Sequence, residues 1–303
     1  MEASLRNRLT FGPLMLLGLF ALLGLDYAAQ AWPALHVPTA RGDVALRGVG
    51  LLVLLIVVLP IAVREVATLF AAEQVKPYRL IAALGSGALV LHAFLTQFAT
   101  FRPIATSTLA FIVVGVMLAA ALRRAWGQQS SEAIHHMAGT VLATLYLGGL
   151  GWFIVALRVK QSPHFTGTTI TILMMLLVVK FTDIGAYFGG RAFGKRKLIP
   201  WLSPGKTWEG LFFGVMTAAA VGAACAPFIG GENGYALPWW KGAIFGGVIG
   251  GIGQLGDLLE SLMKRDAEVK DSGRLVPGFG GILDIIDSPL LAAPFAYLLF
   301  SVF

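Results

Sequence analysis

Residues 104–122 read IATSTLAFIVVGVMLAAAL and contain no charged side chain. A helix of about 20 such residues crosses the ~30 Å hydrocarbon core of a bilayer. Comparable stretches recur throughout the chain, which has 303 residues, 57% of them hydrophobic and 13% charged. Soluble domains have roughly 25% charged residues. The sequence therefore predicts an integral membrane protein.

The apolar stretches predict an all-α fold, a polytopic transmembrane helix bundle of about nine spans. The expected ranges are 10–25, 48–63, 80–98, 104–122, 138–157, 168–188, 208–229, 241–260 and 288–303, of which the second and last are short. Arg6 and Arg8 precede the first apolar stretch as in a signal peptide, but no small-residue cleavage site follows. We therefore expect a retained first helix.

Lysine and arginine are divided unevenly between the predicted loops. The N-terminus and the loops after the second, fourth, sixth and eighth spans hold sixteen of these residues, against six in the opposite loops. Basic loops stay in the cytoplasm, so the N-terminus and the loops near 189–207 and 261–287 are expected to face it. The net charge of +7 follows from this topology and does not indicate nucleic-acid binding.

Acidic residues concentrate in the second half of the chain, where ten of the sixteen lie from Asp183 onward. We expect residues 1–158 to serve packing and lipid contact, and residues 159–303 to form the catalytic region. Lys180 and Asp183 have the i, i+3 spacing of a helical ion pair. An ionisable residue at membrane depth indicates function, whereas His92 is expected to be a packed, hydrogen-bonded side chain.

The seventh predicted span opens with SPGKTWEG, residues 203–210. Ser203 suits the N-cap position and Pro204 the first helical turn. Lys206 and Thr207 then lie near a helix N-terminus, where backbone N–H groups and the helix dipole favour anions. The segment predicts contact with phosphate oxygens, although a simple helix start explains the same residues.

The most polar stretch, residues 253–288, reads GQLGDLLESLMKRDAEVKDSGRLVPGFGGILDIIDS. Asp257 and Lys264 lie seven residues apart and share one helix face. Asp284 and Asp287 lie three apart and lead into the last span. Several carboxylates at one end of the helices suit a hard cation such as Mg²⁺, which together with lysines binds nucleotide phosphates. A charged loop with local salt bridges is the alternative.

These blocks resemble those of the phosphatidate cytidylyltransferase (CDP-diacylglycerol synthase) family over about residues 175–290. The family's C-terminal motif is matched by Ser261, Lys264–Arg265, Lys270–Asp271, Gly273, Pro277–Gly278, Gly280–Gly281, Asp284 and Asp287. Two positions depart from it, because Phe279 stands where the family has histidine and Ile285 where it has arginine.

The resemblance implies an enzyme of phospholipid biosynthesis that condenses CTP with phosphatidate to give CDP-diacylglycerol and pyrophosphate. It implies Mg²⁺, with a monovalent cation as a further candidate. The implied partners are CTP, phosphatidate, membrane lipids and a second copy of the chain, with no nucleic acid. The compact chain is typical of a bacterial inner-membrane protein, and the active site is expected to face the cytoplasm.

The resemblance and carboxylate chemistry together assign the site residues. The metal ligands are expected to be Asp257, Asp284 and Asp287. The catalytic residues are expected to be Lys206, Lys264, Asp284 and Asp287. CTP is expected to contact Ser203, Lys206, Thr207, Asp183, Lys270 and Asp271.

Three other interpretations stay open at the level of sequence. The chain could transfer a cytidylyl group to another lipid phosphate. It could be a lipid or ion transporter in which Lys180 and Asp183 gate the substrate. Phe279 and Ile285 also allow a catalytically silent relative.

Overall fold

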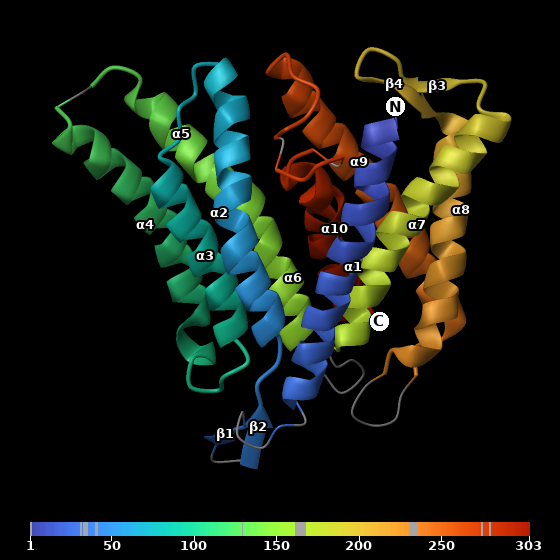
Figure 1. Ribbon diagram of the computed structural model, residues 1–303. Coiled ribbons are helices and arrows are strands. Elements are labelled where there is room, and N and C mark those ends of the chain that lie inside the picture. The colour runs from blue at the N-terminus through green and yellow to red at the C-terminus, as the bar shows by residue number, and fades with distance from the viewer. Residues whose placement is uncertain are drawn as a thin grey trace. The chain divides into compact units, whose positions relative to one another are not determined.

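Helices account for nearly all regular structure in the computed structural model (Figure 1). The structure describes residues 2–30, 32, 36–39, 42–128, 130–160, 168–230, 236–273, 275–278 and 280–303. Within these residues, eight helical segments are long and apolar enough to cross a membrane, and Arg79–Leu95 is a shorter apolar helix. The predicted class, an all-α polytopic membrane protein, is confirmed.

The helices follow the expected spans in order. They are α1 (Glu2–Gln30), α2 (Val49–Ala72), α3 (Arg79–Leu95), α4 (Ala105–Trp126), α5 (Ala133–Thr144), α6 (Leu150–Val159), α7 (Thr169–Phe193), α8 (Trp208–Cys225), α9 (Trp239–Asp266) and α10 (Leu283–Val302). A π-helical turn, η3 (Leu145–Gly149), joins α5 to α6, and short 3-10 turns precede α4 and follow α8. Two antiparallel hairpins pair β1 (His36–Thr39) with β2 (Gly42–Ala45), and β3 (Lys197–Ile199) with β4 (Ser203–Thr207).

Two spans expected to be short are longer in the structure. Helix α2 continues past Arg64 to Ala72, and α10 begins at Leu283, so that Asp284 and Asp287 are both helical. Hydropathy marks only the apolar part of a helix, whereas backbone hydrogen bonding carries the helix past charged side chains at its ends. The two aspartates therefore lie on the helix and not in the loop before it.

Contacts divide the described chain into two units. One comprises Met1–Val159 with Asp266–Ile285, and the other comprises Lys160–Arg265 with Ile286–Phe303. The functional division expected at residues 158 and 159 remains a prediction. The loop between α9 and α10 groups with the N-terminal helices.

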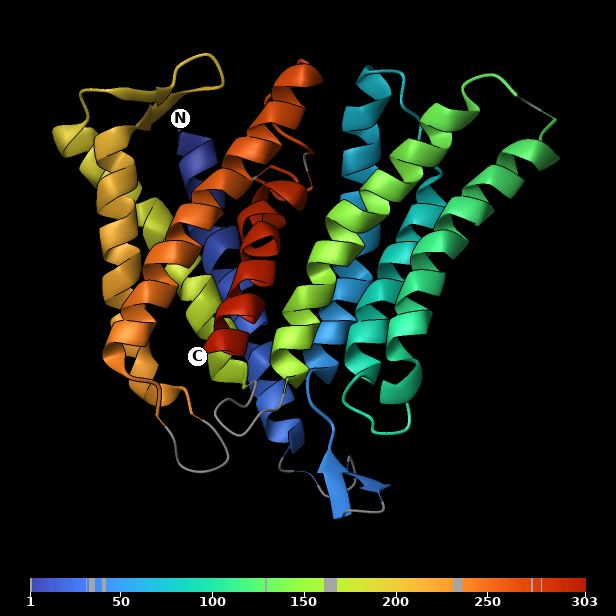
Figure 2. The same ribbon diagram turned by 180° about the vertical axis from the view of Figure 1, so that it is seen from behind.

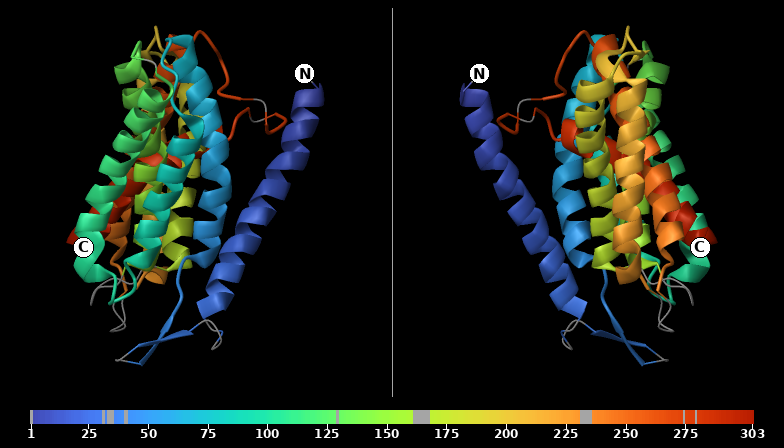
Figure 3. Two further views of the ribbon diagram at one scale, coloured as in Figure 1. Left: turned by 90° about the vertical axis from the view of Figure 1, so that its left-hand side faces the viewer. Right: turned by 90° about the vertical axis from the view of Figure 1, so that its right-hand side faces the viewer.

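In the first unit, α3 packs against α2, α4 and α6. Helix α1 leans away from α2 over its N-terminal half (Figure 3). Near its other end Asp26 accepts a hydrogen bond from Gly50 N (3.3 Å) and pairs with the buried Arg158 at 2.7 Å. The prediction for His92 is confirmed, because its Nδ1 accepts from Trp152 Nε1 (2.9 Å) and its Nε2 lies 2.7 Å from Ala105 O.

In the second unit, α7 and α8 pack along their lengths. Helix α9 runs beside α8 (Figure 2), and the two helices meet at small residues. Gly246 lies directly against the Ala218 carbonyl, and Gly242 directly against that of Gly222. A Cβ atom at either position would collide with backbone. Small residues allow this close approach of helices in lipid.

One local prediction is wrong. Ser203 does not cap a helix, because residues 203–207 form strand β4 and the helix begins only at Trp208. Thr207 is the N-cap, and its Oγ1 accepts a hydrogen bond from Gly210 N at 3.0 Å. Thr207 has extended backbone geometry and a hydroxyl acceptor, as an N-cap requires. Pro204 is accommodated because a two-stranded hairpin has only edge strands.

Candidate active site

Three carboxylates meet between α9 and α10 in the second unit. Asp257 and Glu260 come from α9 and Asp287 comes from α10, and one oxygen of each lies within 4.8 Å of the others. Glu260 and Asp287 are buried, with exposures of 1% and 5%. Asp257 is half-buried. The structure thus brings together two of the three expected metal ligands and adds Glu260.

The closeness of the two helices depends on Gly256. A Cβ atom there would lie 3.0 Å from Ser288 Cα and 3.2 Å from the Asp287 carbonyl oxygen. These distances are tighter than ordinary van der Waals contacts, so the backbone of α10 would have to shift by a few tenths of an ångström to admit a Cβ atom. Gly256 therefore sets the spacing that places Asp257 and Glu260 beside Asp287.

Gly256→Val is expected to reduce the turnover number of the protein by about 100-fold, because displacing catalytic groups by ~1 Å costs that much. The matched control is Gly251→Val on the same helix, where a Cβ atom meets nothing within 4 Å. Both variants are measured after their size-exclusion profiles in detergent match the wild type. Equal activities of the two variants would contradict a role for the α9–α10 spacing.

Two lysines face the carboxylates. Lys206 Nζ lies 2.7 Å from Asp257 Oδ2, and Lys264 Nζ lies 2.9 Å from Glu260 Oε2. Lys206 reaches the group from β4, whereas Lys264 lies one helical turn beyond Glu260 on α9. With all three carboxylates ionised, the two ammonium groups leave one excess negative charge. The arrangement is therefore electrostatically suited to a further cation.

The donor set fits a hard divalent cation. Carboxylate oxygens are the preferred ligands of Mg²⁺, which takes few protein ligands and keeps room for phosphate oxygens. Two of these carboxylates are buried, where neighbouring like charges are costly. Asp257, with 39% of its side chain exposed, leaves the group open on one side.

Gln254 links Asp183 to this group. Its Nε2 donates a 2.8 Å hydrogen bond to Asp183 Oδ1 on α7, and its main-chain oxygen accepts from Lys206 Nζ at 3.4 Å. Lys180 is exposed, and among the described residues no ion pair joins it to Asp183. Lys180 and Asp183 therefore form no close ion pair, because the Asp183 carboxylate is hydrogen-bonded to Gln254 on α9.

Asp284 lies in the first unit and accepts hydrogen bonds from the loop before α10. Its Oδ2 accepts hydrogen bonds from Gly281 N (2.6 Å), Ser272 N (3.2 Å) and Ser272 Oγ (2.9 Å). Lys270 and Asp271, both expected to contact CTP, are exposed. The metal-ligand role expected for Asp284 stays a prediction.

Of the two departures from the family motif, Phe279 and Ile285, the structure describes only Ile285. Phe279 lies outside the described residues. Ile285 is half-buried in the first turn of α10, and its backbone N–H donates to Ile282 O at 3.0 Å. The apolar side chain at this position is therefore compatible with the start of the helix.

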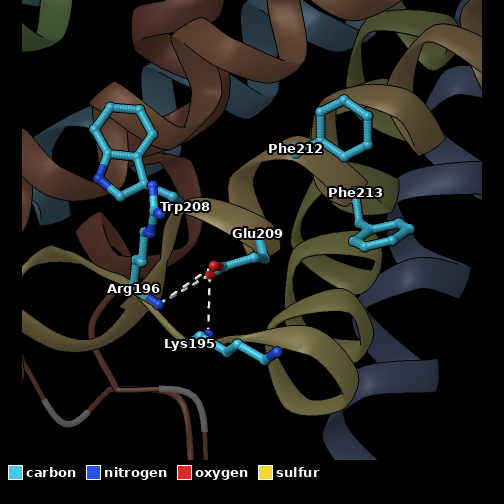
Figure 4. A pocket seen from close by; sticks show the side chains of 6 residues that line it. All are labelled: Lys195, Arg196, Trp208, Glu209, Phe212 and Phe213. Carbon is cyan, nitrogen blue, oxygen red and sulfur yellow. Dashed lines mark hydrogen bonds between the residues drawn. The ribbon is translucent and has the colours of Figure 1, made fainter.

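A pocket of about 620 Å³ lies at the start of α8, a few residues beyond Lys206 (Figure 4). Its lining combines cations with aromatic rings and comprises Lys195, Arg196, Trp208, Glu209, Phe212 and Phe213. Glu209 accepts hydrogen bonds from the backbone N–H groups of Lys195 (3.1 Å) and Arg196 (3.2 Å). Such a lining suits an anionic amphiphile.

Sequence reasoning assigned no role to Glu260, Gln254 or Glu65. Glu260 and Gln254 each lie three residues from Asp257 on α9, and this spacing is a usable signal for a shared face. Glu65 offers no such signal, because it follows Arg64 at the end of an apolar stretch and resembles an ordinary interfacial charge. Its partners lie more than 200 residues away.

The fold and site define a polytopic membrane protein with a carboxylate–lysine centre suited to phosphate chemistry. The model of the cytidylyltransferase family matches residues 32–303, and the chain belongs to that family. This membership confirms the resemblance stated from the motif residues.

Several curated relatives carry the name phosphatidate cytidylyltransferase, among them proteins of Brucella, Haemophilus and Bacillus. The protein of Brucella suis biovar 1 (strain 1330) is 37% identical over 173 residues, which are 54% of this chain and 62% of the relative. That of Haemophilus influenzae is 44% identical over 150 residues, 47% of this chain and 50% of the relative. That of Bacillus subtilis (strain 168) is 33% identical over 238 residues, 78% of this chain and 85% of the relative. The chain thus spans about three fifths of the length of the Brucella relative.

Proposed function

We propose that the protein is a phosphatidate cytidylyltransferase that condenses CTP with phosphatidate to give CDP-diacylglycerol and pyrophosphate. The observation that carries this proposal is the group of Asp257, Glu260 and Asp287 beside Lys206 and Lys264. Family membership and the names of the relatives support the same reaction.

In this reaction a phosphate oxygen of phosphatidate attacks the α-phosphorus of CTP. The new P–O bond forms as the bond from the α-phosphorus to the bridging oxygen breaks, and pyrophosphate leaves with that electron pair. The protein contributes positioning and charge stabilisation. A phosphomonoester is already anionic near neutral pH, so the lipid phosphate needs no general base. A residue without an imidazole at position 279 is consistent with this requirement.

Mg²⁺, when bound, would neutralise charge on the nucleotide phosphates. Asp257, Glu260 and Asp287 would hold it, and Lys206 and Lys264 would contact phosphate oxygens. Ser203 and Thr207 are proposed to line the phosphate site, and Asp183 to orient the group through Gln254. Lys270 and Asp271 remain proposed contacts of CTP, and a monovalent cation remains a proposed second ion.

The placement in the cell follows from the loop charges. The excess of lysine and arginine near β3, β4 and the α9–α10 loop supports a site that faces the cytoplasm of a bacterial inner membrane. CTP would then reach the site from the cytosol and phosphatidate from the bilayer. The cationic and aromatic pocket in Figure 4 supports an acidic lipid as one reactant. A homodimer is proposed from the family resemblance.

The test is pyrophosphate release by the purified protein in detergent with CTP, phosphatidate and Mg²⁺, each omitted in turn. Release that requires all three supports the proposal. If a folded preparation releases pyrophosphate only with a different lipid phosphate, phosphatidate is not the acceptor. If it never releases pyrophosphate, the protein is not a cytidylyltransferase.

A further inference from the structure

Glu65 is a buried carboxylate on α2 that binds the loop leading into α10. Its exposure is 9%. Its Oε1 accepts a hydrogen bond from Ile282 N at 3.0 Å, and its Oε2 accepts from Leu283 N at 2.7 Å. Both partners belong to the same contact unit as α2, although they are more than 200 residues away in sequence.

These two N–H groups lie at the start of helix α10, where Ile282 is the residue before the helix and Leu283 is its first residue. The first N–H groups of a helix have no partner within it and need an acceptor from elsewhere. Glu65 supplies that acceptor, and its negative charge is favourable at the positive end of the helix dipole. A residue of α2 therefore determines where α10 starts.

Ser272 connects Glu65 to Asp284. The Ser272 hydroxyl lies 3.5 Å from Glu65 Oε2 and 2.9 Å from Asp284 Oδ2. Asp284 also accepts from Gly281 N, so the two carboxylates bind Ser272 on one side and Gly281 and Ile282 on the other. Ser272 therefore contacts one carboxylate from α2 and one from α10.

Two glycines of the loop lie directly against the Glu65 carboxylate. A Cβ atom at Gly273 would collide with Glu65 Oε1, and one at Gly281 would lie 2.7 Å from Glu65 Oε2. Both positions must therefore lack a side chain if the carboxylate is to reach the backbone. The glycines of the family motif and the acidic residue of α2 form one structural unit.

We propose that Glu65 is a positioning residue for the transfer reaction. It fixes Ser272 at the start of the loop and the first turn of α10, which carries Asp284. It acts through these residues and contacts no substrate itself. The inference rests on the proposed function for its catalytic consequence, whereas the loop geometry can be tested without turnover.

Glu65→Gln is the test variant. The amide keeps the shape of the side chain, but its nitrogen is a donor, so only one of the two backbone N–H groups keeps an acceptor. We expect the turnover number to fall by about 100-fold, as for a ~1 Å displacement of reacting groups, with the KM for CTP changed by less than about threefold. The matched control is Glu73→Gln, an exposed glutamate beyond the end of the same helix, which is expected to leave both constants unchanged.

Loop order is measured separately with a nitroxide label at Leu275→Cys in a Cys225→Ala background, since Cys225 is the only cysteine and Leu275 is exposed. The label is expected to be immobile in this background and with Glu73→Gln, and mobile with Glu65→Gln. If Glu65→Gln does not fold, Gly273→Ala is used instead, because its Cβ atom would displace the carboxylate. It should lower the turnover number and increase the mobility of the label in the same way.

The combined outcomes separate the inference from the proposed function. Increased label mobility in a protein without any transferase activity would support the loop role and overturn the proposed function. Unchanged label mobility in a folded variant would overturn the inference, as would a loss of activity that appears entirely in the KM for CTP.

Discussion

Asp257→Asn is expected to lower the rate of cytidylyl transfer by about 1,000-fold, equivalent to ~4 kcal/mol of transition-state stabilisation. Asp257 is the most exposed member of the carboxylate group and the one paired with Lys206, at 2.7 Å. Replacing its carboxylate with an amide removes one negative charge from a site suited to a divalent cation. The remaining activity should therefore require a higher Mg²⁺ concentration. Initial rates across a Mg²⁺ titration measure both effects.

The control for this prediction is Asp266→Asn. Asp266 is an exposed carboxylate at the end of the same helix, so its removal changes the net charge equally without touching the group. Activity and Mg²⁺ dependence of Asp257→Asn that equal those of Asp266→Asn would exclude Asp257 from the site.

Lys206→Gln is expected to reduce kcat/KM for CTP by about 100-fold, the usual effect of removing one group that stabilises developing charge. Lys206 carries its ammonium from β4 to α9, where it contacts Asp257 and the Gln254 carbonyl. The side chain is 17% exposed, so its charge is partly shielded from water. Steady-state kinetics with varied CTP at saturating phosphatidate measure the change.

Lys197→Gln is the matched control, because Lys197 is an exposed lysine on the partner strand β3 of the same hairpin. It should retain kcat/KM within about threefold of the wild type. If the two lysine variants lose activity to the same extent, the effect belongs to the basic hairpin as a whole and the specific role of Lys206 is wrong.

The helices were predictable because hydropathy is a local property. Each apolar stretch carries its own signal, and all nine expected ranges coincide with helical segments of the described chain. The ends of α2 and α10 were not predictable in this way. Arg64 and Glu65 and then Asp284 and Asp287 are charged, so the apolar signal stops before the backbone helix does.

The hairpin of β3 and β4 shows how local signals can compete. Ser203 and Pro204 fit a helix start, yet Thr207 four residues later also fits, and the structure uses Thr207. The choice depends on the pairing of Lys197 with Thr207 across the hairpin. Such pairing is tertiary information that an N-cap pattern does not contain.

The carboxylate group was partly predictable. Asp257 and Asp287 were expected from the motif and chemistry, but their meeting depends on Gly256, whose role requires knowing that α9 and α10 touch. Glu65 was not predictable, because its identity as a buried cap depends on backbone N–H groups more than 200 residues away. The positions of Gly256 and Glu65 in the site depend on packing between residues distant in sequence, which spacing along the chain does not reveal.

The fate of labelled phosphorus tests the central claim most directly. Purified protein in detergent is given phosphatidate, Mg²⁺ and CTP labelled at either the α- or the γ-phosphorus. The proposed reaction predicts that the α label enters a lipid that partitions into organic solvent, while the γ label remains in water as pyrophosphate. Water-soluble α label in every fraction, from protein that is folded by size-exclusion profile, would contradict cytidylyl transfer to phosphatidate.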